Sequence, residues 1–245
     1  MLDLLYASRC ASCGAYGPAL CRACAAAAGV IFAPVCERCG RPTEEPVPAC
    51  GDCPPPNLTR ARAPFLYQGP VADAIRALKF RGWGWLAGSL GGAMAHALGP
   101  DRADVITWVP LTRRRRAARG FDQAQLLARA VARRLDLPWS RLLHRSRHTG
   151  SQARRGGRER RTALEGTFWA RSPVPGSILL VDDVLTTGAT AAACAAALRE
   201  AGAGRVILLT AARSLGTGVP ARCFGGYNRT GPSPGSVVAR GDDPR

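Results

Sequence analysis

Lysine is nearly absent from this 245-residue chain, and acidic residues are scarce relative to basic ones. Lys79 is the only lysine, yet 34 lysine and arginine residues stand against 17 acidic residues, giving a formal net charge of +17. A GC-rich genome explains part of the preference for arginine codons, but it does not explain the excess of cations over anions. Because arginine presents a planar fork of donors that matches phosphate, this excess predicts a polyanionic partner, either a nucleic acid or a phosphorylated ligand.

Long apolar runs are also missing. No stretch approaches the roughly 20 apolar residues that cross a bilayer, so we expect no membrane span. The first five residues, MLDLL, have neither the basic segment nor the apolar run of a signal peptide. We therefore expect a cytoplasmic protein. Thiols stay reduced there, so the ten cysteines are better explained as metal ligands than as disulfides.

Composition divides the chain into three parts. Residues 1–56 hold eight of the ten cysteines and end in three consecutive prolines, which is typical of a linker. Residues 57–213 are expected to form the main domain. Residues 214–245 are rich in Gly, Pro, Ser and Arg without periodicity, a composition that predicts a disordered tail.

Strand-like and helix-like runs alternate through residues 104–213. The apolar runs predict strands at 105–109, 178–181 and 206–209. Helical spacing predicts helices at 122–135 and 190–200, and two more upstream at 71–80 and 86–98. This alternation predicts an α/β fold in which a parallel sheet is flanked by helices.

Eight cysteines form four Cys-x2-Cys pairs before the main domain. The pairs are Cys10 with Cys13, Cys21 with Cys24, Cys36 with Cys39, and Cys50 with Cys53. Each pair presents two thiolates to one metal ion and tetrahedral zinc takes two pairs, so we expect two structural zinc ions. Sequential pairing is the simplest arrangement, but a cross-braced one stays open. Because so small a module cannot bury a large core, metal binding is expected to supply its folding energy.

The stretch 178–190, ILLVDDVLTTGAT, is the most informative part of the chain. Its four apolar residues predict a strand, and Asp182 and Asp183 follow where that strand is expected to end. Ligands of open α/β sheets bind at the carboxyl ends of strands. Since adjacent carboxylates need donors to satisfy them, we expect these two to accept hydrogen bonds from the 2′- and 3′-hydroxyls of a ribose.

A loop of small and hydroxyl residues follows the two acids and opens a helix. Thr186, Thr187 and Thr190 supply hydroxyls, and Gly188 and Ala189 let a ligand approach the backbone closely. Free N–H groups at a helix N-terminus attract anions, so this loop is expected to hold a 5′-phosphate. The alternative is an acidic strand end followed by a capped helix without a ligand.

The same stretch resembles the phosphoribosyl pyrophosphate (PRPP) motif of type I phosphoribosyltransferases. With the cysteine pairs and the segments LKFRG (78–82) and RGFDQ (119–123), it makes residues 8–213 similar to the ComF family of competence proteins. One departure is Asp122, where the family usually has asparagine. The resemblance implies a type I phosphoribosyltransferase-like sheet behind a zinc-ribbon-like module, and a role in DNA uptake.

The resemblance also implies roles for individual residues. Asp182 and Asp183 would bind the ribose and be the catalytic residues of any transfer at its C1, while the loop 186–190 would hold the 5′-phosphate. Leu111, Thr112 and Arg113 would contact pyrophosphate, which Mg²⁺ accompanies in such sites. Catalysis would then rest on positioning and charge stabilisation rather than on a dedicated nucleophile.

Two arginine runs lie at 113–116 and 145–161, and the resemblance places the second in a loop over the active site. That loop would close on pyrophosphate or on a nucleic-acid backbone, or else be a solvated surface. Few aromatic residues interleave with these arginines, so the sequence does not indicate a base-stacking platform.

Three functions stay open at this point. The first is a PRPP-binding accessory protein of DNA uptake, whose arginines and zinc module engage single-stranded DNA or a helicase. The second is an active phosphoribosyltransferase on an unidentified acceptor. The third is a zinc-ribbon nucleic-acid-binding protein without catalysis.

Overall fold

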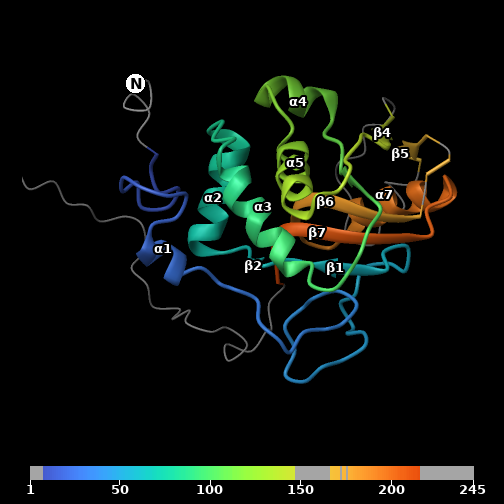
Figure 1. The fold of residues 1–245 in the computed structure, drawn as a ribbon, viewed down its shortest axis with the longest axis horizontal. Helices are drawn as coiled ribbons and strands as arrows, with labels where there is room; N and C mark the ends of the chain where they lie inside the picture. Colours follow the sequence, from blue (N-terminus) through green and yellow to red (C-terminus); the bar gives the residue numbers. More distant parts are fainter. Residues whose placement is uncertain (1–7, 147–165, 172, 175, 216–245) are drawn as a thin grey trace, which may run out of the picture.

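The computed structural model describes residues 8–146, 166–171, 173–174 and 176–215 (Figure 1). Its centre is a five-stranded parallel sheet in the order β1, β7, β6, β3, with β2 pairing a later part of β7. The strands are β1 (Arg60–Arg62), β2 (Phe65–Leu66), β3 (Val105–Trp108), β6 (Ser177–Leu185) and β7 (Arg205–Arg213). The parallel sheet predicted from the alternating runs is therefore present.

Helices cover both faces of this sheet, as its apolar strands require. Side chains alternate between the faces of a strand. Thus Leu179 and Val181 of β6 pack in one core cluster, and Ile178 and Leu180 in the other. The first cluster lies under α2 (Gly69–Phe80), α3 (Leu86–Ala97) and α5 (Gln123–Leu135). The second lies under α7 (Ala189–Glu200) and a small antiparallel sheet of β4 (Leu143–Arg145) and β5 (Phe168–Ala170).

The expected end of the strand at Val181 is wrong. Strand β6 continues through both acids to Leu185, because β7 pairs with it along that whole length. Asp182 lies opposite Thr210, and Leu185 lies opposite Arg213. The backbone of a neighbouring strand supplies the hydrogen bonds of the ladder whatever the polarity of the side chains, and the sequence pattern of one strand does not report this.

The cysteine-rich module consists mainly of turns, with one short helix, α1 (Arg22–Ala26). Its second half is docked on the edge of the sheet. Ala61 N–H donates to the carbonyl of Arg38 at 2.8 Å, and the Arg62 guanidinium donates to the carbonyl of Glu37 at 2.7 Å. Arg213, buried at the end of β7, donates to the carbonyl of Cys39.

Helix α4 (Arg113–Arg119), like the short helix α1, has no buried residue. The described residues contain no helix long and apolar enough to cross a membrane. All but two residues of the expected tail at 214–245, and most of the arginine run at 145–161, lie outside the described residues.

Candidate functional site

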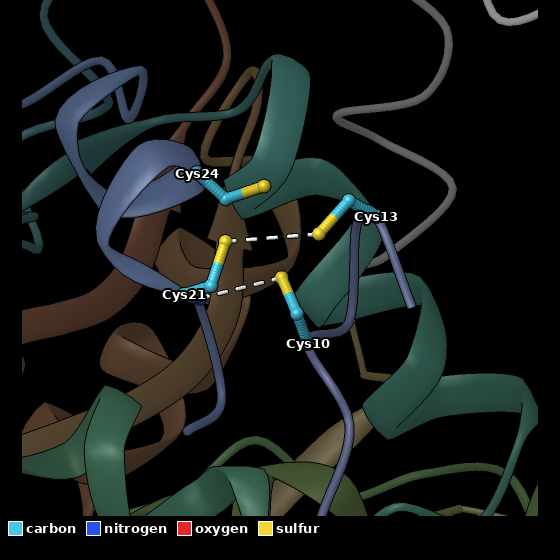
Figure 2. A group of neighbouring side chains, drawn as sticks. All are labelled: Cys10, Cys13, Cys21 and Cys24. Carbon is cyan, nitrogen blue, oxygen red and sulfur yellow. Dashed lines mark hydrogen bonds between the residues drawn. The ribbon is translucent and has the colours of Figure 1, made fainter. Parts of the chain in front are cut away.

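The eight N-terminal cysteines gather into two groups of four. One contains Cys10, Cys13, Cys21 and Cys24, and the other Cys36, Cys39, Cys50 and Cys53. Within each group all sulfur atoms lie within 4.8 Å of one another. In Figure 2 the four side chains of the first group point toward a common centre, two from a turn and two from the start of α1. The sequential pairing is therefore correct, and cross-bracing is excluded.

The sulfur separations fit zinc. Four thiolates at about 2.3 Å from a tetrahedral ion lie about 3.8 Å apart. The Sγ atoms of Cys13 and Cys21 are 3.6 Å apart, and those of Cys36 and Cys53 are also 3.6 Å apart. Gly14 and Gly40 follow their pairs with φ of 77° and 69°, a conformation that favours glycine. Two structural zinc sites follow from this geometry.

Asp183 is already engaged within the protein. It points to the face of the sheet covered by α2 and α5, where its Oδ1 lies 2.8 Å from Lys79 Nζ at the end of α2. Gln123, the first residue of α5, donates to its Oδ2 at 2.8 Å. Asp183 is 5% exposed. Asp183 thus has two partners within the protein, while its predicted role toward a sugar diol stays a prediction.

Asp182 is placed differently, because successive residues of a strand point to opposite faces. It lies on the α7 side, where it lines a cavity of about 60 Å³ with Thr210 and the loop 186–190. Its Oδ1 accepts a hydrogen bond from Asp183 N–H at 2.8 Å. Loss of hydration raises the pKa of the Asp182 carboxyl well above 3.8, and repulsion from Asp183 raises it further.

The loop between β6 and α7 forms an open cradle. Gly188 is the N-cap of α7 with φ of 74°, and Thr186 and Thr187 are exposed. Thr187 Oγ1 accepts from Ala189 N–H at 3.4 Å. The cavity has roughly the liquid volume of two water molecules, so it has room for a small anionic group. It is too small for a whole PRPP molecule, most of which would lie outside it.

The segment 110–113 lies at the same edge of the sheet as the two acids. Trp108 pairs with Val181, and Val109 N–H donates to the Val181 carbonyl at 3.0 Å. Leu111 and Thr112, which come shortly after the end of β3, therefore lie at the same edge of the sheet as Asp182 and Asp183, which come directly after Val181 in β6. Thr112 also caps α4 by accepting from Arg115 N–H at 3.2 Å, and Arg113 begins that helix with an exposed side chain.

Asp122 acts as a helix cap. Its Oδ1 accepts from Ala124 and Gln125 N–H at 3.1 and 3.3 Å at the start of α5, and its Oδ2 accepts from Leu111 N–H at 3.4 Å. Burial raises the pKa of this carboxyl, and the backbone donors offset part of the rise. Aspartate and asparagine both cap helices well, so the departure from the family's asparagine preserves this role.

The sequence does not predict three of the contacts at this site. Lys79 and Gln123 belong to the LKFRG and RGFDQ segments, which signalled the family but not that both side chains meet Asp183. Pro54, the first residue of the expected linker, lies against the loop 186–190: a Cβ added at Gly188 would be 2.8 Å from Pro54 Cβ. Nothing in the sequence predicts the contact between Pro54 and Gly188, because these residues are 134 positions apart.

The sequence of this chain is similar to a known domain family and to several known proteins. The model of the double zinc ribbon domain matches residues 1–54. DNA utilization protein YhgH of Salmonella typhimurium is 32% identical over 207 residues, covering 80% of this chain and 91% of that protein. Competence protein F of Haemophilus influenzae is 28% identical over 183 residues, covering 69% of this chain and 80% of that protein.

Among solved structures, orotate phosphoribosyltransferase from Aeropyrum pernix is similar at 19% identity and a TM-score of 0.34, over 56% of this chain and 75% of that one. The sequence relatives carry the assignment, since a protein more than 30% identical is matched over nine-tenths of its length and the double zinc ribbon stands at the N-terminus. With competence protein F among those relatives, this chain belongs to the ComF family.

Proposed function

We propose that this protein binds PRPP, with Mg²⁺, at the carboxyl end of β6, and that it serves the uptake and use of DNA in the cytoplasm. The observation that carries the PRPP proposal is the open cavity between Asp182 and the loop 186–190, at the N-terminus of a twelve-residue helix. The names of the relatives, a DNA utilization protein and a competence protein, support the role in DNA handling.

The cavity suits the 5′-phosphate of PRPP. It lies before the first turn of α7, where unpaired N–H groups and the helix dipole favour a negative charge. The exposed hydroxyls of Thr186 and Thr187 add donors. With the phosphate there, the ribose would lie over the cavity mouth, where its diol can donate to Asp182.

Asp183 takes part only if its present pairing changes. Lys79 and Gln123 each contact one of its oxygens, and Asp183 is 5% exposed, so in this proposal a diol takes the place of one of them. Lys79 is the better candidate to leave, because a pyrophosphate beside it offers a stronger anionic partner. In this proposal Lys79 passes from Asp183 to pyrophosphate as the ligand binds, while Arg113 and the backbone of Leu111 and Thr112 approach from the end of β3.

Mg²⁺ would be held mainly by pyrophosphate oxygens and water, with the Asp182 and Asp183 carboxylates as its protein partners. When bound, it would neutralise the charge that develops on the leaving pyrophosphate. In a transferase reaction the ribose C1–O bond to pyrophosphate breaks as a bond from the acceptor forms. The described residues would contribute by holding the ribose and placing cations by the leaving group.

Calorimetric titration with PRPP, with and without Mg²⁺, tests this proposal. We expect one PRPP per chain for the wild-type protein and at least a tenfold weaker affinity for Asp182→Asn/Asp183→Asn, because both diol acceptors lose their charge. Glu200→Gln is the control, since it removes an exposed carboxylate at the far end of α7. If the double variant and the control bind PRPP equally well, the site assignment is wrong, and the zinc-ribbon nucleic-acid-binding alternative gains.

A further inference from the structure

Aromatic side chains lie exposed on the turn between α2 and α3. Phe80 is 69% exposed and Trp85 is 45% exposed. Trp83 is partly buried against the core and stacks on Trp85, with ring centroids 5.9 Å apart and planes 26° apart. Large apolar side chains that cluster on a surface usually mark a binding site.

Arginines meet these rings from two directions. The Arg119 guanidinium of α4 lies over Phe80, with Cζ 4.8 Å from the ring centroid, and Arg81 lies over Trp83 at 5.8 Å. In Figure 1, α4 and the turn between α2 and α3 lie at the same, upper end of the molecule. We call this surface the platform; it consists of Phe80, Arg81, Trp83, Trp85 and the arginines of α4.

The platform carries charge of one sign. The sequence has no acidic residue between Asp73 and Asp101, and none between Asp104 and Asp122. The nearby carboxylates of Asp122 and Asp183 are buried and already hydrogen-bonded. The exposed side chains of Arg113 to Arg116 form no hydrogen bond or ion pair with any other residue in the described part of the chain.

Helix α4 has no face committed to the core. Thr112 caps its start, and Gly120, with φ of 75°, ends it. A helix that buries nothing gains little from packing, so its caps hold four unpaired guanidinium groups in solvent beside the aromatic rings. The fold brings together aromatics at 80–85 and arginines at 113–119, which the length of α3 and β3 separates in sequence.

We propose that the platform binds single-stranded nucleic acid, with bases stacked on Phe80 and Trp85 and phosphates paired with the arginines of α4. Aromatic faces accept any unpaired base, and arginine pairs with phosphate. A duplex hides its base faces in its own stack, so a single strand fits better. The proposal extends the proposed role in DNA handling by naming the surface and the form of nucleic acid it takes.

The platform adjoins the proposed PRPP site, and Arg113 belongs to both. Phe80 follows Lys79 in the chain, and Arg119 donates to Gln123 Oε1 at 2.9 Å, the same glutamine that donates to Asp183. Arg119 therefore touches both sites, and test variants should leave Arg113 and Arg119 in place so that the two functions are measured separately.

Fluorescence anisotropy with labelled single strands, oligo(dT) and oligo(rU), at about 50 mM salt tests the rings. Stacking contributes about 1–3 kcal/mol per base, so we expect Phe80→Ala/Trp85→Ala to weaken single-strand binding at least tenfold. The control is Phe32→Ala, which removes a ring 58% exposed in the cysteine-rich module; it should change affinity less than twofold. Normal zinc content and an unchanged PRPP titration would show that the double variant is folded.

The salt dependence of the same binding tests the arginines. Each phosphate contact contributes about 0.7 to the slope of log K against log salt for a single strand. We expect Arg114→Ala/Arg115→Ala to lower that slope by about 1.4, and the control Arg133→Ala/Arg134→Ala, on the exposed end of α5, to leave it unchanged.

Three results would overturn the platform. They are equal affinity of Phe80→Ala/Trp85→Ala and wild type, an equal loss in Phe32→Ala, and tighter binding of a duplex than of either single strand. A preference between oligo(dT) and oligo(rU) identifies the natural strand. Failure of PRPP to bind the wild-type protein would refute the proposed function while leaving the anisotropy result intact, so the two are distinguishable.

Discussion

At the scale of single residues, Gly188 links the two parts of the protein. It is the N-cap of α7 with φ of 74°, and the space where its Cβ would lie is filled by Pro54, just after the last cysteine pair. A side chain at this position would therefore meet both backbone strain and a collision. The sequence indicates a close backbone approach at Gly188, but it assigns that approach to a ligand and does not reveal the proline.

Gly188→Ala compared with Gly99→Ala separates these two effects. Gly99 has φ of 62° and nothing within 4 Å of an added Cβ, so alanine there should lower the free energy of unfolding by about 1 kcal/mol through strain alone. We expect Gly188→Ala to lose at least about 1 kcal/mol more in denaturant unfolding, because Pro54 must shift. If the two variants lose the same free energy of unfolding, Pro54 moves away from an added Cβ at no cost, and the collision makes no contribution.

Asp182 shows a conflict between stability and function. Its folded-state pKa lies above the unfolded value of about 3.8, so the folded protein favours the protonated carboxyl. Well below that value both states are protonated and Asp182 has no effect. As pH rises from that value toward the folded pKa, ionisation in the unfolded state increasingly opposes folding, and the loss of stability is complete above the folded pKa. We expect Asp182→Asn, which can still accept a hydrogen bond from Asp183 N–H, to remove this pH-dependent loss of stability.

Thermal unfolding across pH measures the effect. Asp182→Asn and wild type should melt alike near pH 3, and the variant should melt a few degrees higher at pH 8, since about 1 kcal/mol shifts the melting temperature by 2–4 °C in a protein of this size. Glu200→Gln should show no such trend. A variant that melts lower at pH 8 than the wild type would contradict the burial argument.

At the scale of elements, the long strands and helices follow from the sequence and the short ones do not. Apolar runs and helical spacing locate β3, β6, β7, α5 and α7, but β6 and β7 each continue four residues beyond their expected ends. Strands β1, β2, β4 and β5 have two or three residues each. Such strands exist because a partner backbone lies beside them, and their own residues carry no periodicity that could predict them.

The two zinc ribbons also differ at this scale. The first contacts α2, where Ser12 donates to Asp73 at 2.9 Å. The second is attached to β1 and β7, and Arg38 donates to the carbonyl of Pro54 at 2.8 Å, so it supports the proline that packs on Gly188. The spacing of the cysteines predicts both ribbons equally and gives no sign of this asymmetry.

Removing one ligand from each ribbon tests the asymmetry. Cys21→Ser and Cys50→Ser change partly exposed cysteines of the first and second group, and each should lower zinc from two to one per chain. We expect only Cys50→Ser to weaken PRPP binding, by roughly two- to thirtyfold, because coupling through packed contacts is worth about 0.5–2 kcal/mol. An equal effect of the two substitutions on PRPP affinity would refute this difference.

At the scale of the whole molecule, motifs identify the family and tertiary contacts define the surfaces. Four cysteine pairs and the stretch 178–190 suffice to predict a zinc module before an α/β sheet. The pairing of Asp183 with Lys79 and Gln123, and the contact of Phe80 with Arg119, join residues 39 to 104 positions apart. One sequence contains no information on which distant side chains meet. The contacts of Asp183 and the platform are therefore visible only in the folded structure.

The central claim is that the cradle at the end of β6 takes the phosphoribosyl group of PRPP, and a crystal structure of the protein with PRPP and Mg²⁺ tests it most directly. We expect the 5′-phosphate in the cavity before α7, the ribose diol donating to Asp182, and Lys79 turned from Asp183 toward pyrophosphate. A structure in which PRPP lies elsewhere, while Lys79 stays on Asp183 and the cradle holds only water, would contradict the account.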